Sequence, residues 1–226
     1  MRYEIVGKGA FPMVKINLEK GESIKAESGA MVAMEDTVDV DGKMEGGIMG
    51  GIGRMFSGEK FFFQQLKANR GAGEVLISTV TPGGITALEL DGTKNWRLQK
   101  DGFLAGSDSI QVDTNMQNLT KGIFSGEGFF VLKVSGRGTL FVSSFGEIYE
   151  LDIPAGKEYV VDNQHLVAWE DGVNYKIEKS SGGWISSITS GEMLVCRFTG
   201  PAKVYIQTRN PSGFGHWVRQ FIPQKA

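Results

Sequence analysis

Three stretches of this sequence place the same residue types at nearly the same spacing. Each begins with a leucine, reaches an alanine 15 residues later in the first two stretches and 17 in the third, and has an aspartate three residues further on. A β-branched residue follows each alanine by five positions. The members are Leu18, Ala33, Asp36 and Val38; Leu90, Ala105, Asp108 and Ile110; and Leu151, Ala168, Asp171 and Val173. Self-similarity at a fixed spacing is typical of repeated structural units, so the sequence predicts three tandem copies of one small module, related by a pseudo-threefold repeat.

A second element also recurs three times. A Gly-Glu pair opens an apolar run at 73–77, 126–132 and 191–195, and a turn glycine follows the glutamate by eight or nine residues. Val14–Leu18 alternates apolar and polar residues, as a half-buried strand does. With 32 glycines, the chain has turn signals about every 8–12 residues, as in a sandwich or barrel. The predicted fold class is therefore all-β, and the sequence leaves room for short helical turns only near Met49–Phe56, Asn115–Thr120 and His216–Phe221.

The repeat also predicts the domain organisation. The whole chain, 1–226, is expected to form one compact unit of three repeats. Module one covers 1–86 and carries a glycine-rich insertion, module two covers 87–145, and module three covers 146–210. Residues 211–226 form a C-terminal tail. Ala33, Ala105 and Ala168 are expected to superpose.

Composition excludes several classes of protein. The net charge is −2 and no dense basic cluster is present, so no nucleic-acid partner is expected, because phosphate contacts need lysine and arginine. A single cysteine, Cys196, allows no disulfide within one chain, and its apolar surroundings predict a small buried core residue. The first residues lack the apolar core of a signal peptide, and no apolar run approaches a membrane span. The expected location is the cytoplasm.

The residues that usually carry catalysis or metal binding are sparse. Only two histidines are present, His165 and His216, and they fall at different places relative to the repeat, so no histidine cluster is expected. His165 is expected to be a structural turn residue and His216 a surface or docking residue. The repeated aspartates are expected in hairpin turns, where their side chains bind backbone amides. The alternative is three carboxylates gathered around the repeat axis. The sequence thus predicts no enzyme activity, no catalytic residue, no metal and no cofactor.

The glycine-rich stretch Gly46–Phe56 is the most unusual part of the chain. Such a loop can cradle phosphate, but the Lys-Ser/Thr of a P-loop is missing. It can also be a segment where glycine lets backbones pack closely. The interpretation chosen here is a contact with another subunit or a lipid surface, since large apolar side chains stand among the glycines. The candidate binding residues are Ile48, Met49, Ile52, Arg54, Met55 and Phe56.

An ordered set of short motifs resembles a known family. The set comprises Gly29–Val32, Gly46–Phe63, Pro82–Ile85, Phe103–Ala105, Gly126–Gly128, Val161–Asp162, His165–Ala168 and Gln207–Arg209. In this order, across nearly the whole chain, it resembles the family named for altered inheritance of mitochondria. The resemblance implies a fold similar to the tryptophan RNA-binding attenuator protein, a small β-module that forms rings. It implies no catalytic residues, and RNA binding does not transfer because the chain is acidic.

Together these features predict a non-enzymatic scaffold or interaction protein that assembles with itself. A homo-oligomer is expected, with a protein partner or a lipid surface as further partners. The alternative function is a small-molecule or lipid/membrane-surface binding protein that uses a cleft between modules or the glycine-rich loop.

Overall fold

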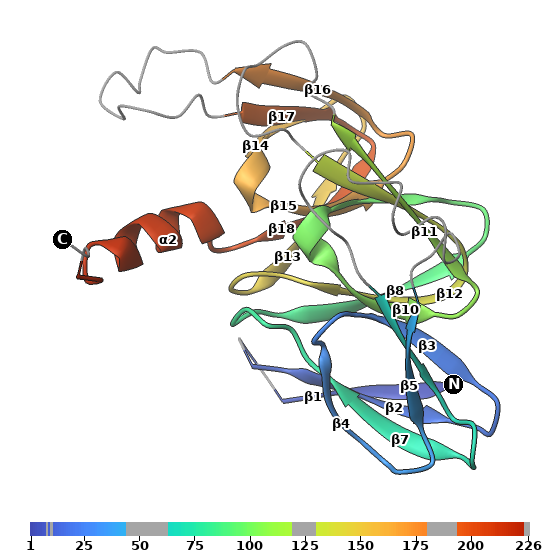
Figure 1. Ribbon diagram of the computed structural model, residues 1–226. Coiled ribbons are helices and arrows are strands. Elements are labelled where there is room, and N and C mark those ends of the chain that lie inside the picture. The colour runs from blue at the N-terminus through green and yellow to red at the C-terminus, as the bar shows by residue number, and fades with distance from the viewer. Residues whose placement is uncertain (8, 10, 44–62, 119–129, 180–193, 224–226) are drawn as a thin grey trace.

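The computed structural model describes residues 1–226 apart from 8, 10, 44–62, 119–129, 180–193 and 224–226 (Figure 1). Antiparallel strands dominate the described part of the chain, and one α-helix, α2, stands apart near the C-terminus. The predicted all-β class is therefore confirmed. The strands are β1 (Arg2–Val6), β2 (Met13–Leu18), β3 (Ser23–Glu27), β4 (Met31–Met34), β5 (Asp39–Lys43), β6 (Phe63–Lys67), β7 (Gly73–Ile77), β8 (Ile85–Asp91), β9 (Trp96–Gln99), β10 (Phe103–Ser107), β11 (Ile110–Asn118), β12 (Phe130–Ser143), β13 (Ile148–Ile153), β14 (Glu158–Asp162), β15 (Leu166–Glu170), β16 (Asn174–Lys179), β17 (Leu194–Thr199) and β18 (Ala202–Gln207). Two 3₁₀ turns, η1 (Lys100–Gly102) and η2 (Asn163–His165), precede β10 and β15, and α2 spans Pro211–Arg219.

The strands form three sheets. A four-stranded sheet has the order β1-β2-β7-β4, and a three-stranded sheet has the order β14-β17-β16. Between them, a large sheet runs β13-β18-β15-β9-β12-β10-β3-β6-β5, with β8 and β11 also paired to β12. Figure 1 shows the early strands at one end of the molecule and β14, β16 and β17 at the other.

Side-chain alternation explains why these segments are strands. In β2 every second residue is buried, and Val14 and Ile16 are completely inaccessible. The half-buried positions that alternate with them include the polar side chains Lys15 and Asn17. This pattern puts one face of the strand against a core, as the alternation in the sequence predicted.

The same irregularity occurs in three strands, at the three recurring alanines. The register of β4 against β7 shifts between Met31 and Ala33. The register of β10 against β12 shifts just before Ala105, and that of β15 against β18 shifts just before Ala168. A bulge of this kind adds a residue to one strand and re-aims the side chains that follow it. Superposition of the three segments stays a prediction.

The middle of the chain is organised around β12, which is 14 residues long. Its first half pairs with β9 and β11, and its second half with β8 and β10. One sequence expectation changes here. Asn115–Asn118 lies in β11, not in a helical turn, because Gln117 and Asn118 pair with β12. The proposed boundary between 86 and 87 falls inside β8, which starts at Ile85.

Three hydrophobic clusters hold the sheets together. The first packs residues of β2, β3, β6 and β7 with Leu104 and Phe141. The second is centred on β9, β10 and β12, and the third surrounds Trp169, Cys196 and Phe198. Cys196 is completely buried in β17, as the sequence predicted.

Candidate functional site

The predicted binding residues lie outside the described part of the chain. Ile48, Met49, Ile52, Arg54, Met55 and Phe56 all fall within 44–62. Their role in contacting a subunit or a surface therefore stays a prediction.

The C-terminal helix α2 is the most exposed apolar element that the structure describes. Asn210 caps it, because its Oδ1 accepts a hydrogen bond of 2.9 Å from the backbone N–H of Gly213. Pro211 then occupies the first turn, where a missing N–H costs nothing. The sequence placed a helical turn only near 216–221, and the Asn-Pro start signal was available to extend it.

Aromatic rings on α2 and in the turn that follows it pack against one another. Phe214 stacks on Trp217, and Trp217 meets the ring of Phe221 edge-on at a centroid distance of 5.0 Å. Phe214 also contacts the ring of Phe145, which lies between β12 and β13, at a centroid distance of 5.3 Å. Trp217 remains 55% exposed and Phe221 68% exposed, so the described residues leave this surface largely open to water.

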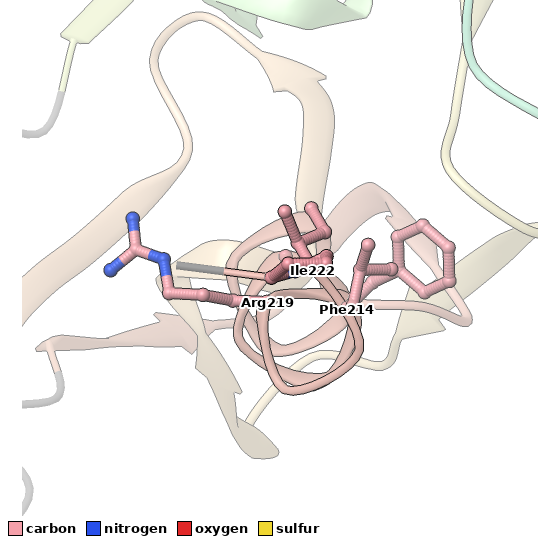
Figure 2. A pocket seen from close by; sticks show the side chains of 6 residues that line it. Phe214, Arg219 and Ile222 are labelled. Atoms are coloured by element: carbon pink, nitrogen blue, oxygen red, sulfur yellow. The ribbon is translucent and has the colours of Figure 1, made fainter. Parts of the chain in front are cut away.

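A hollow of about 640 Å³ lies against the same helix (Figure 2). Phe214, Val218, Ile222 and Pro223 line it with apolar surface, and Arg219 contributes the one charged side chain. In Figure 2 the Arg219 guanidinium points away from the Phe214 ring. An apolar surface with a cation at its border suits an amphipathic partner better than a small polar substrate.

Exposed apolar side chains also lie on strands. Val32 in β4 is 54% exposed, and in β14 Tyr159 and Val160 are 46% and 49% exposed. Among the described residues, β4 pairs only with β7 and β14 only with β17. Each strand therefore has one edge without a partner in the described structure. Unpaired edges of this kind are templates for pairing with another chain.

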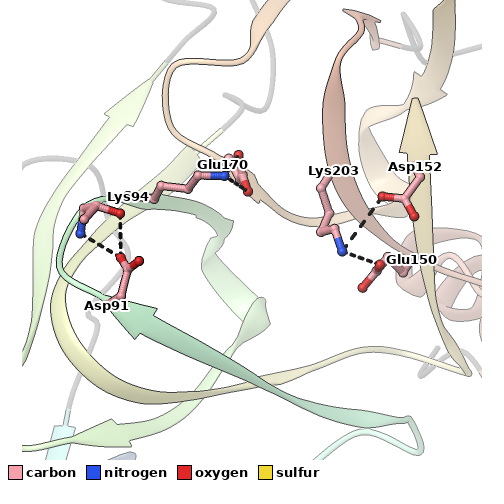
Figure 3. Close-up of polar contacts among 7 residues, drawn as sticks. Asp91, Lys94, Glu150, Asp152, Glu170 and Lys203 are labelled. Carbon is pink, nitrogen blue, oxygen red and sulfur yellow. Dashed lines mark hydrogen bonds and ion pairs between the residues drawn. The ribbon is translucent and has the colours of Figure 1, made fainter. Parts of the chain in front are cut away.

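The polar clusters are ion pairs along strand surfaces (Figure 3). Lys203 in β18 lies between Glu150 and Asp152 of β13. Hydrogen bonds from Lys203 and Tyr205 hold the pKa of Glu150 below its usual value. Lys94 contacts Glu170 at 2.8 Å in the same way. Lys203 pairs across two neighbouring strands, whereas Lys94 reaches Glu170 of β15 from the turn between β8 and β9. Each charge has a partner, so these ion pairs support the fold.

The recurring aspartates lie in turns between consecutive strands, but these are not the hairpin turns that the sequence predicted, because the two strands at each turn pair with other strands and not with each other. Asp36 joins β4 to β5, Asp108 joins β10 to β11, and Asp171 joins β15 to β16. Their partners differ: Gln65 donates to Asp108, whereas Arg97 and Lys133 contact Asp171 at 2.7 and 2.8 Å. Burial alone would raise the pKa of Asp171, but the hydrogen bonds from Lys133 and Arg97 hold it below its usual value. The aspartates thus bind separate partners at separate turns.

The surroundings of the two histidines and of the cysteine indicate structural roles. His165 ends the turn η2, and its Nδ1 lies 2.7 Å from the carbonyl oxygen of Gln207. His216 lies on exposed α2 with Nδ1 2.8 Å from the carbonyl oxygen of Ser212. Burial raises the pKa of the Cys196 thiol to about 12, so it carries little thiolate. Within the described ranges, no group of three or more His, Cys, Asp or Glu side chains is placed to hold a metal ion.

Glu27 is the titratable group that sequence reasoning missed. It lies at the end of β3, and burial together with the charge of Asp101 raises its pKa to about 7. Asp101 is 74 residues away along the chain, so no local pattern in the sequence marks the pair.

Known proteins match this sequence over nearly its whole length. The family model described as mitochondrial biogenesis AIM24 matches residues 3–209. An uncharacterized protein of Streptococcus pyogenes serotype M6 is 36% identical over 231 residues, covering 99% of this chain and 92% of that protein. The protein named altered inheritance of mitochondria protein 24, mitochondrial, of Verticillium alfalfae is 26% identical over 80% of this chain, which spans 47% of the fungal protein.

A solved structure has the same fold. The crystal structure of a Streptococcus pyogenes protein matches with a TM-score of 0.80 and 36% identity, covering 98% of this chain and 99% of that one. No helix in the described ranges is long and apolar enough to cross a bilayer. Sequence, fold and the resemblance noted above agree, and the chain belongs to the AIM24 family.

Proposed function

We propose that this chain is a non-enzymatic scaffold that assembles with itself and is built from three equivalent units. Each unit comprises six strands in the same order: β2–β7 in the first, β8–β12 in the second, with β12 counting twice, and β13–β18 in the third. In each unit the first strand pairs with the last, as β2 with β7, β8 with β12 and β13 with β18.

The observation that carries the proposal is how these units are joined. β10 of the second unit pairs with β3 of the first, and β15 of the third pairs with β9 of the second. The chain therefore already holds neighbouring units together by edge-to-edge strand pairing. Contacts of this type between copies are a natural extension, because backbone edges pair without requiring a particular side-chain pocket.

Self-assembly predicts that the molar mass in solution exceeds that of one chain. Light scattering coupled to size-exclusion chromatography, over a range of loading concentrations, measures it directly. A mass that rises with concentration, or a stable multimer of the 24.6 kDa chain, supports the proposal. A monomer at every concentration up to the millimolar range would contradict it.

A second candidate function, binding to a lipid surface, is favoured by α2. Trp217 is exposed on α2, Phe221 and Ile222 are exposed in the turn that follows it, and Arg219 is the charged residue of the helix. No acidic residue occurs after Glu192. Aromatic and aliphatic side chains beside cations are typical of helices that lie in the interface of anionic membranes. Flotation with phosphatidylserine-containing vesicles, against phosphatidylcholine alone, should recover the wild type and not Trp217→Ser/Phe221→Ser. Equal recovery of both proteins would contradict this function.

A further inference from the structure

Two junctions inside the chain use one strand register. Where β10 meets β3, Ala105 lies opposite Ala26, and where β15 meets β9, Ala168 lies opposite Leu98. Both alanines come directly after the register shift of their strand. The two junctions therefore place the residue that follows the bulge against the same position of the neighbouring unit.

That position is defined by the sequence spacing. In each unit it lies seven residues before the alanine of the same unit. The pairs are Ala26 and Ala33, Leu98 and Ala105, and Val161 and Ala168. Both strand types are buried where they meet, with Ala26 and Leu98 at 0% exposure.

One strand of each type is left over. β4 corresponds to β10 and β15 but pairs only with β7 in the described structure. β14 corresponds to β3 and β9 but pairs only with β17. Figure 1 shows β4 and β14 in opposite end portions of the molecule. The two open edges are therefore complementary in type, and they are well separated within one chain.

Side-chain exposure marks the same two edges. Val32 precedes Ala33 and is 54% exposed, whereas its counterparts Leu104 and Val167 are 0% and 1% exposed. On β14, Tyr159 is 46% exposed, whereas its counterpart Ile24 is completely buried. Positions that the internal junctions bury thus face water at the two ends.

We propose that β4 of one copy pairs antiparallel with β14 of a second copy, in the register of the internal junctions. Ala33 then lies opposite Val161, and Met34 lies opposite Val160. This inference rests on the self-assembly proposed above and names the surfaces that carry it. The contact is head-to-tail, so a linear assembly keeps one open edge at each of its two ends and either grows into a filament or closes into a ring.

The proposed register also determines which charged residues lie opposite each other across the contact. At the junction of β15 with β9, the backbone N–H of Asp171 donates to the carbonyl oxygen of Asn95 at 2.7 Å. The corresponding residues at the proposed contact are Asp36 and Glu158, two carboxylates. Like charges placed opposite each other weaken strand pairing, so association should tighten when one of them is reversed.

The decisive experiment blocks each edge separately. Val32→Lys places a charge on β4 and Val160→Lys places one on β14, a device that natural edge strands use against pairing. Each variant alone should be monomeric under conditions where the wild type associates. Mixed together, they should form a one-to-one dimer and nothing larger, because each retains the edge that the other has lost. Val80→Lys, at a loop residue that is 78% exposed, is the matched control and should associate as the wild type does.

Two further variants test the register. Met34→Cys combined with Val160→Cys should form disulfide-linked multimers under mild oxidation, and Val80→Cys combined with Val160→Cys should not. Asp36→Lys should tighten association by about two- to fivefold. Weaker association of Asp36→Lys, or equal cross-linking of both cysteine pairs, would overturn the register.

The outcomes separate this inference from the proposed function. If the wild type associates and both lysine variants associate equally well, the β4–β14 contact is wrong while self-assembly stands. If the mixture of the two variants remains monomeric although the wild type associates, the contact is not head-to-tail. If the wild type is monomeric throughout, both proposals fail.

Discussion

At the scale of single residues, Glu27 makes the stability of this protein depend on pH. Its pKa rises from 4.5 to about 7 on folding, chiefly through burial. Between these values the folded state retains a proton that the unfolded state has released, so the free energy of unfolding falls as pH rises through that window. Glu27→Gln should remove this fall, which we expect to be on the order of 1–2 kcal/mol after solvent screening.

Urea unfolding of wild type and Glu27→Gln from pH 4.5 to 7.5 measures the difference. Glu19→Gln, at a side chain that is 70% exposed, is the control and should follow the wild-type profile. A constant difference between Glu27→Gln and wild type across the window would show that Glu27 does not titrate there.

Cys196 gives a second prediction at this scale. Its side chain is completely buried and its pKa is about 12, so a thiol reagent at neutral pH meets almost no accessible thiolate. Labelling with iodoacetamide should be negligible in native protein and complete in urea. Fast labelling of the native protein would place the thiol at the surface.

At the scale of elements, α2 should contribute little to the stability of the strands. None of its residues is buried, and its contact with the rest of the described chain centres on Phe214 and Phe145, whose ring centroids are 5.3 Å apart. A ring pair of this kind is worth about 0.5–1.5 kcal/mol. A chain ending at Asn210 should therefore unfold within about 2–6 °C of the full chain in a thermal scan. A much larger loss would mean that α2 packs as part of the core.

Elements were predictable from sequence where one strand alone sets the pattern. Apolar and polar residues alternate in Val14–Leu18, and this segment forms a strand, as the alternation predicts. The turn at Asp171 depends only on Asp171 and the glycine that follows it. By contrast, the order of strands depends on partners far away, as when β10 crosses to β3. The helix α2 was underestimated because its start depends on Asn210 and Pro211, which precede the aromatic residues. The surface of β4 was unpredictable, since exposure of Val32 depends on which strand pairs beside it.

At the scale of the whole molecule, the pairings of β10 with β3 and of β15 with β9 predict unequal effects of one substitution. Ala105 and Ala168 are completely buried, whereas Ala33 is exposed. Ala105→Leu should cost about 1–3 kcal/mol, because added methylene groups must displace close-packed neighbours. Ala33→Leu, studied at low protein concentration, should change the free energy of unfolding by about 0.5 kcal/mol or less. Chemical unfolding of the two variants checks this, and equal effects would contradict the difference in packing.

The length of β12 has a consequence for how the molecule opens. Four strands, β8 to β11, are hydrogen-bonded to β12 along its 14 residues. Unfolding β12 therefore requires all four of these strand pairings to break together. In the described structure no strand pair joins either outer sheet to the large sheet, so each outer sheet can detach by losing side-chain packing. Amide hydrogens near the centre of β12 should therefore exchange with deuterium last, and those of β1 and β16 much earlier, as partial opening precedes global unfolding. The protein would then loosen from its two ends inward, with its middle as the last region to lose protection.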